Sequence, residues 1–221
     1  MKKTSLFVSL GLLLAITLSS ACSDNQAPLA IEADADEYGN TPATQITTDL
    51  NQQVLQQLPF SDQQDFDEAQ RGLIASVGEL KTPGRDGKLA WDQTAYQFIT
   101  GDAPASVNSS LWRQAQLNNI HGLFKVTEGI YQLRGFDLAN ITIIEGKTGW
   151  IIVDPLTTQE TASTALSFAR EQLGKHPIAA IIFTHSHADH FGGALGVLSA
   201  SKTEANHVRV IAPAGFMDES I

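Results

Sequence analysis

The segment T-H-S-H-A-D-H-F-G-G at residues 184–193 constrains the fold more than any other part of this sequence. It follows the apolar run IAAIIF at residues 178–183, which is the length of a buried strand. It ends on two glycines, which let the backbone turn sharply into a helix. A loop between a buried strand and a helix lies at the carboxyl end of the strand, where α/β sheets collect ligands. The sequence therefore predicts an α/β fold with a site at residues 184–193.

This loop contains four side chains that commonly bind metal ions: His185, His187, Asp189 and His190. Neutral imidazole and carboxylate are the ligands that zinc takes where no thiolate is present. Alternate side chains of an extended segment point the same way, so we expect His185 and His187 to share one ion and Asp189 and His190 to face a second. Two neighbouring ions with a shared water suit hydrolysis. The alternative is a His-rich surface loop that binds metal by accident, and the strand before it and the glycines after it favour a true site.

Short apolar runs alternate with turn signals from residue 124 onward. β-branched runs favour strands, and apolar residues at helical spacing favour an amphipathic helix. The predicted order is strands at 124–126, 130–134, 141–144 and 150–153, a helix at 162–173, a strand at 178–183, a helix at 192–198 and a strand at 208–211. Such an order is typical of a sheet covered by helices. Thr157 and Glu160 are expected to form the capping box of the first of these helices.

The chain before residue 124 has a weaker pattern. Residues 44–58 and 62–77 are predicted to be helical, the second because acidic residues fill its first two turns. Residues 79–110 are rich in Gly, Pro, Asp, Ser and Asn and are expected to be mainly loops.

The first 21 residues are typical of a secretory signal peptide, with two lysines, an apolar run at residues 6–18 and then small residues. Cys22 follows directly, so it is a candidate for the lipid-modified first residue of a lipoprotein, although Leu18 lies one position further away than usual. An ordinary cleavage site is the alternative. Both predict an exported protein, either periplasmic or anchored in the outer membrane by a lipid, with the acidic stretch 23–43 as a tether.

Composition excludes one class of partner. The formal net charge is −10, and no cluster of Lys or Arg occurs beyond the first three residues. Nucleic acid is therefore not an expected partner, since phosphate binding requires a basic surface. The single cysteine also excludes a disulfide within the chain.

The motif H-x-H-x-D-H before Gly-Gly resembles the signature of the metallo-β-lactamase superfamily. This resemblance implies that His185 and His187 bind a first zinc ion and that Asp189 and His190 bind a second. It also implies that Asp189 orients or deprotonates the attacking water, and that Asp154, at a predicted strand end, supports the metal loop from behind. Two flanking stretches, SVNSSLWRQ at 106–114 and GLFKVTEGIYQLRGFDLANITIIEGKTGWIIVDPLTT at 122–158, are similar to type III alkyl sulfatases, exported bacterial enzymes that hydrolyse alkyl sulfates such as dodecyl sulfate.

The resemblance implies the first half of a metallo-β-lactamase-like αββα sandwich, preceded by a helical and loop region. The expected divisions are a signal peptide at 1–21, a tether and helix at 22–60, an N-terminal extension at 61–120 and a partial metallo-β-lactamase domain at 121–221. In the family, further ligands, substrate-binding residues and two C-terminal domains come from later segments, so we expect this chain to be an inactive fragment. A homodimer is expected only of the complete protein. Two alternatives remain, another hydrolase of this fold, such as a β-lactamase or lactonase, and a non-catalytic exported lipoprotein.

Several other polar and aromatic residues have a plain structural interpretation. We expect packing or surface roles for His121, His176, His207, Trp112, Trp150 and Tyr131. Arg134 and Lys147 are either attractors of an anionic sulfate or ordinary surface charges.

Overall fold

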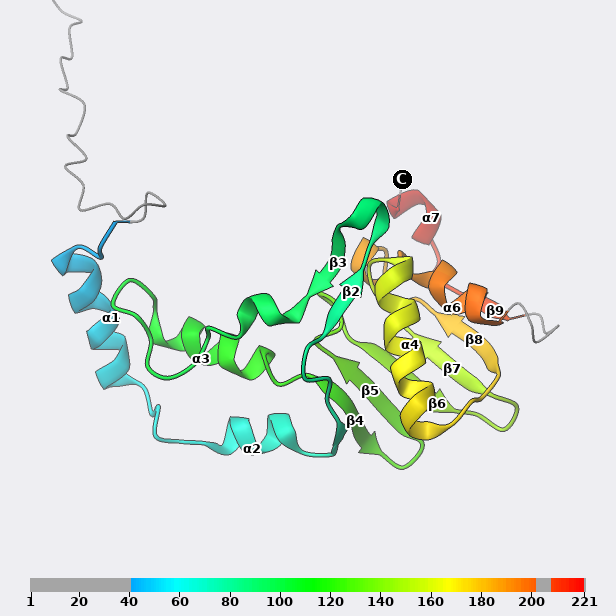
Figure 1. Ribbon diagram of the computed structural model, residues 1–221, viewed down its shortest axis with the longest axis horizontal. Helices are drawn as coiled ribbons and strands as arrows, with labels where there is room; N and C mark the ends of the chain where they lie inside the picture. Colours follow the sequence, from blue (N-terminus) through cyan, green and yellow to red (C-terminus); the bar gives the residue numbers. More distant parts are fainter. Residues whose placement is uncertain (1–40, 202–207, 221) are drawn as a thin grey trace, which may run out of the picture. The chain divides into compact units, whose positions relative to one another are not determined.

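A mixed sheet organises the chain in the computed structural model, which describes residues 41–201 and 208–220 (Figure 1). Its seven strands lie in the order β1-β4-β5-β6-β7-β8-β9 within the described ranges. They are β1 (Leu73–Ala75), β4 (Gly122–Thr127), β5 (Ile130–Arg134), β6 (Ile141–Glu145), β7 (Trp150–Val153), β8 (Ile178–Ile182) and β9 (Arg209–Ile211). Strands β1 to β7 pair antiparallel, and β8 and β9 add on in parallel.

One face of this sheet forms the hydrophobic core. Ile143 of β6 pairs with Ile152 of β7, and both side chains are fully buried. Helix α4 (Gln159–Leu173) lies over this face (Figure 1) and buries Ala162, Ala165, Leu166 and Ala169 against it. Helix α6 (Ala194–Ser201) packs beside α4. The predicted order of strands and helices from residue 124 onward is confirmed.

The N-terminal part differs from the prediction in two places. Helix α1 (Gln45–Gln57) forms as expected, but α2 (Gln64–Gln70) ends seven residues before the predicted end at residue 77. Gly72 then adopts φ 77°, and a Cβ there would lie 2.2 Å from the carbonyl oxygen of Lys125. This close approach turns the chain into β1, which pairs with β4. The prediction of a helix over 62–77 is therefore wrong in its second half.

The predicted loop at 79–110 is also largely wrong. It contains a hairpin of β2 (Lys81–Pro83) and β3 (Leu89–Asp92), joined through the short 3₁₀ helix η1 (Arg85–Gly87) and followed by η2 (Gln93–Tyr96). Helix α3 (Ser109–Asn118) then begins with Asn108 as its N-cap. The hairpin lies against α4 (Figure 1). Arg85 Nε lies 3.1 Å from Glu160 Oε1. These strands are stabilised by packing against a helix far along the chain, which local composition does not reveal.

Several other expectations concern the ends of elements. The capping box of α4 uses Thr158 and Thr161, one residue later than predicted from Thr157 and Glu160. The signal peptide, Cys22 and His207 lie outside the described residues. Among the described residues, no helix is both long and apolar enough to cross a membrane.

The core face of β6 can be tested with two adjacent isoleucines. Ile143 is fully buried on the α4 side, whereas Ile144 is only half-buried on the opposite side. We expect Ile143→Ala to lower the free energy of unfolding by about 2–5 kcal/mol, because it leaves a cavity in a packed interior. Ile144→Ala should have a clearly smaller effect. Urea unfolding followed by circular dichroism measures both, and an equal or larger loss for Ile144→Ala would contradict this assignment of faces.

Candidate metal centre

The segment at residues 184–193, called the metal loop below, begins just after β8. The backbone of Phe183 donates to the carbonyl of Ile211 on β9, and the backbone of Asp154 donates to the carbonyl of Ile182 on β8. The metal loop therefore starts at the carboxyl ends of three neighbouring strands. Short helix α5 (Ala188–Phe191) follows within the loop, and Gly192 and Gly193 lead into α6. This is the sheet edge at which the sequence predicted a site.

Asp154 connects the end of β7 to both ends of the ligand cluster. Its Oδ1 accepts the backbone N–H of Thr184 at 2.8 Å, and its Oδ2 accepts the Thr184 hydroxyl at 2.6 Å and His190 Nδ1 at 2.8 Å. The carboxylate is buried, with 7% of the residue exposed. Such hydrogen bonds to a histidine ring are typical of the residues that orient metal ligands. The geometry agrees with the supporting role expected for Asp154, and that role stays a prediction.

These hydrogen bonds also fix which nitrogen of two histidines carries a proton. His190 must donate from Nδ1 to the Asp154 carboxylate, which leaves the lone pair on Nε2. The Thr184 hydroxyl donates to Asp154, so its contact of 2.9 Å with His185 Nδ1 assigns the donor role there to the ring N–H. In the neutral form of both rings, Nε2 is then the nitrogen that carries the lone pair. Both rings are therefore assigned the tautomer that binds a metal through Nε2.

The four predicted ligands lie together. The ring of His185 is centred 4.6 Å from that of His187 and 4.1 Å from that of His190. Asp189 Oδ2 lies 3.4 Å from His190 Nε2. These pairwise contacts make the four side chains neighbours, and their role as metal ligands stays a prediction.

Among the described residues, the ligand atoms that lie within 4.8 Å of one another as a group of three are those of Asp154, His185 and His190, and His187 and Asp189 are not part of this group. We favour Asp189 over Asp154 as the carboxylate ligand, because Asp154 already accepts three hydrogen bonds and Asp189 faces the free nitrogen of His190. Imidazole nitrogens and a carboxylate oxygen with unused lone pairs fit zinc well.

The chain between β7 and α4, residues 154–158, is called the crossover segment below. Asp154 has φ 54° and Leu156 has φ 67°, a left-handed backbone that costs roughly 1–3 kcal/mol for such residues. The crossover segment also contacts the end of the metal loop. Gly193 donates its backbone N–H to the carbonyl of Leu156 at 2.8 Å, and a Cβ on Gly193 would lie 2.0 Å from the carbonyl oxygen of Pro155. Both ends of the metal loop are therefore packed on the crossover segment.

A cluster of aromatic side chains packs against the metal loop. The rings of Phe183, Phe191 and Phe216 form a mutual cluster with centroids 5.1–5.9 Å apart. Phe216 belongs to α7 (Phe216–Glu219), and Glu219 Oε2 accepts the hydroxyl of Ser186 at 3.0 Å. The last described helix is thus in direct contact with the metal loop.

The structure separates the two cations proposed as attractors of sulfate. Lys147 is exposed in the turn between β6 and β7, at the opposite end of β7 from Asp154. Arg134 ends β5, whose last residues lie beside the start of β6 and so at the same sheet edge as Asp154. Lys147 is therefore distant from the metal loop along the strands, and only Arg134 remains at the correct edge.

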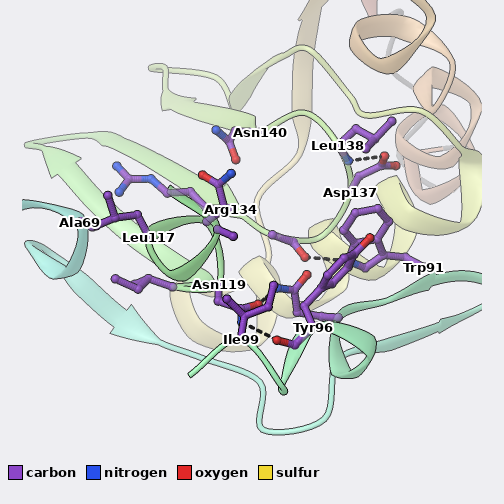
Figure 2. A pocket seen from close by; sticks show the side chains of 15 residues that line it. Ala69, Trp91, Tyr96, Ile99, Leu117, Asn119, Arg134, Asp137, Leu138 and Asn140 are labelled. Carbon is purple, nitrogen blue, oxygen red and sulfur yellow. Dashed lines mark hydrogen bonds between the residues drawn. The ribbon is translucent and has the colours of Figure 1, made fainter. Parts of the chain in front are cut away.

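A cavity of about 550 Å³ lies beside Arg134, between the loop after β5 and the N-terminal region (Figure 2). Trp91 and Tyr96 line it from β3 and η2, and Asn119 lines it from the end of α3 (Figure 2). The Arg134 guanidinium packs on the Phe124 ring at 4.3 Å, and burial lowers its pKa from the ordinary value. None of the four predicted ligands lines this cavity, so it is distinct from the metal loop.

The remaining sequence expectations concern packing residues. Trp150 is buried and stacks on His176, Tyr131 is buried in the core, and Trp112 donates to the carbonyl of Gly101. His121 bridges the carbonyls of Asn119 and Val77. The packing interpretation of these five residues is confirmed. Sequence reasoning missed Asp137, Thr161 and Thr184, whose hydrogen bonds order the site, because nothing in their local pattern distinguishes them.

The close approach at Gly193 generates a test of the contact between metal loop and crossover segment. We expect Gly193→Ala to lower the free energy of unfolding by about 1–3 kcal/mol, because the new Cβ overlaps backbone oxygens and forces the two segments apart. Gly78→Ala is the matched control, since a Cβ there meets nothing within 4 Å and its φ is ordinary. Thermal unfolding measures both, and equal stability of the two variants would show that the segments do not pack as described.

Comparison with known proteins agrees with this geometry. Residues 134–221 match the profile of the Metallo-beta-lactamase superfamily. A protein named (R)-specific secondary-alkylsulfatase, from Pseudomonas sp., is 48% identical over 189 residues, which are 85% of this chain and 28% of that protein. A linear primary-alkylsulfatase from Pseudomonas sp. is 47% identical over 81% of this chain and 27% of that protein. The alkyl/aryl-sulfatase BDS1 of Saccharomyces cerevisiae is 45% identical over 79% of this chain and 27% of that protein.

A solved structure shows the same fold. The sec-alkylsulfatase Pisa1 from Pseudomonas sp. superposes with a TM-score of 0.76 at 47% identity, over 84% of this chain and 29% of that chain. The chain thus spans little more than a quarter of the length of these relatives. The predicted α/β fold class and the predicted family resemblance are confirmed. Residues 134–221 belong to the metallo-β-lactamase superfamily, and over most of its length the chain is a relative of the alkylsulfatases.

Proposed function

We propose that these residues form the metal-binding part of a zinc-dependent hydrolase that converts an alkyl sulfate to an alcohol and sulfate. The observation that carries the proposal is the convergence of His185, His187, Asp189 and His190 at one edge of the sheet, in a chain 45–48% identical to three proteins named alkylsulfatases. Two zinc ions are proposed, as expected from the sequence motif. The proposed substrate class is a small amphiphilic alkyl sulfate.

The proposed chemistry needs a proton acceptor. Hydrolysis of a sulfate monoester consumes one water, breaks the ester linkage and releases a proton, because sulfate leaves as a dianion. Asp189 is proposed to accept or orient that proton, since its carboxylate is partly exposed and lies 3.4 Å from His190 Nε2. Zinc bound at the site would polarise a sulfate oxygen and lower the pKa of the attacking water. His185 and His190 contribute by presenting Nε2 lone pairs in a fixed orientation, because Thr184 and Asp154 engage their Nδ1 atoms.

Sulfate release tests the proposal directly. We expect the protein purified from its own cells to release sulfate from dodecyl sulfate in a zinc-dependent reaction. The double variant His185→Ala, His187→Ala should fall to the uncatalysed background, because it removes two imidazole ligands. His176→Ala is the control, since that ring stacks on Trp150, and Trp150 and His185 lie at opposite ends of neighbouring strands. Residues 22–221 on their own are expected to show no enzyme-like rate.

Two results would contradict this proposal. Turnover of nitrocefin or a lactone without sulfate release would assign the chain to another hydrolase of the same fold. The absence of any metal-dependent activity, together with no effect of the double variant, would favour a non-catalytic exported protein.

We also propose that the protein is exported and carries lipid on Cys22. The support is the sequence alone, a short apolar run followed by small residues and a cysteine. Metabolic labelling with a fatty acid should label the mature protein, and Cys22→Ser should abolish the label. Cleavage without label would instead indicate an ordinary signal peptide, and a labelled Cys22→Ser variant would exclude Cys22 as the lipid site.

A further inference from the structure

The buried carboxylate of Asp137 has no function in the chemistry described so far. Asp137 lies in the loop between β5 and β6, with only 6% of the residue exposed. No Lys, Arg or His among the described residues forms an ion pair with it. A buried charge without a counter-ion requires other compensation, so its hydrogen bonds indicate what it does.

Four donors saturate this carboxylate. Oδ1 accepts the backbone N–H of Leu138 and the hydroxyl of Thr157, both at 2.6 Å, and Oδ2 accepts the backbone N–H of Thr157 at 3.1 Å and the hydroxyl of Thr161 at 2.5 Å. Figure 2 shows the first of these bonds beside the cavity. Thr157 belongs to the crossover segment, and Thr161 lies in the first turn of α4. The partly positive N-terminus of α4 further favours a carboxylate there.

The crossover segment needs such an external constraint. Asp154 and Leu156 both adopt positive φ, a conformation that side-chain-bearing residues keep only where their surroundings enforce it. Asp154 and Leu156 are also the residues through which the segment forms hydrogen bonds with the metal loop. Asp154 bonds Thr184 and His190, and the carbonyl of Leu156 accepts the N–H of Gly193.

We propose that Asp137 is a positioning residue for the metal loop, fixing the crossover segment and through it both ends of the loop. Asp137 lies 48 residues before His185 in the sequence, and none of its four hydrogen bonds involves a predicted ligand. It acts on the site through Thr157, the crossover segment and then Thr184, His190 and Gly193. The inference rests on the proposed function only where metal affinity is concerned.

Amide hydrogen exchange on the metal-free, ¹⁵N-labelled chain tests the positioning directly. The amides of Thr184 and Gly193 donate hydrogen bonds to Asp154 and Leu156 of the crossover segment. Asp137→Ala should reduce the protection of these two amides from exchange, relative to amides in the centre of β6. Asp137→Asn should give an intermediate loss. Each oxygen of Asp137 accepts one backbone N–H, and an asparagine side chain can replace only one of them.

A control variant separates positioning of the metal loop by Asp137 from a general loss of stability on removal of a helix cap. Asn108→Ala removes the N-cap of α3, where Asn108 accepts the backbone N–H groups of Ser110 and Leu111. Both alanine variants should lower the melting temperature, but Asn108→Ala should leave exchange at Thr184 and Gly193 unchanged relative to β6. Equal protection of these two amides in Asp137→Ala and the parent chain would overturn the proposal.

Metal affinity provides the second measurement, by competition with a chromophoric zinc chelator well below the melting temperature. We expect Asp137→Ala to weaken zinc binding by about ten- to hundredfold, and Asn108→Ala to leave it unchanged. If the parent chain binds no zinc but exchange increases in Asp137→Ala, the positioning role stands and the proposed function fails. If zinc binds and neither affinity nor exchange changes in Asp137→Ala, the positioning role is wrong and the proposed function is unaffected.

Discussion

The carboxylate of Asp154 is the interaction on which the candidate centre depends. Asp154 follows β7 directly and has a left-handed backbone conformation. Both oxygens of its carboxylate accept hydrogen bonds from the metal loop. One carboxylate therefore fixes the backbone of Thr184 at the start of the loop and the ring of His190 near its end. Without it, the backbone N–H of Thr184 and the ring N–H of His190 would both lose their acceptor. The orientation of His190 is thus set by the residue that follows a neighbouring strand, and that of His185 by Thr184, whose hydroxyl the same carboxylate holds.

Around this interaction, the packing leaves little freedom for the metal loop. Gly193 lies against the carbonyl of Pro155, and the phenylalanine cluster of Phe183, Phe191 and Phe216 fills the space beneath the loop. A metal site requires ligands that are already oriented before the ion arrives, because ordering flexible side chains opposes binding. The loop contains exposed residues such as His187, yet its two ends are packed and hydrogen-bonded. This combination makes its ligand atoms accessible without making its backbone free.

The elements that were predicted correctly are those determined by short, contiguous stretches of sequence. The β-branched run at residues 141–144 predicted β6, and the four candidate ligands could be identified because they share one short loop. The errors have distant causes. Helix α2 ends early because Gly72 approaches Lys125. The cap of α4 begins at Thr158 because Asp137 engages the N–H and hydroxyl of Thr157, which lies twenty residues after it. An aspartate between two strands carries no signal that it will bond a helix terminus, so its contacts required the three-dimensional structure.

Because β1 pairs with β4, the sheet begins earlier in the chain than the match to the superfamily does. The similarity to the metallo-β-lactamase superfamily begins at Arg134, the last residue of β5. The hydrogen-bonded sheet, however, extends back through β4 to β1, and Trp91 on β3 donates to the carbonyl of Gly135 at 2.8 Å. Removal of the residues before Arg134 would expose the edge of β6 and remove the strand that precedes the loop with Asp137. The region that matches the superfamily is thus shorter than the hydrogen-bonded sheet, and the N-terminal segment adds strands and contacts to the same sheet that carries the candidate site.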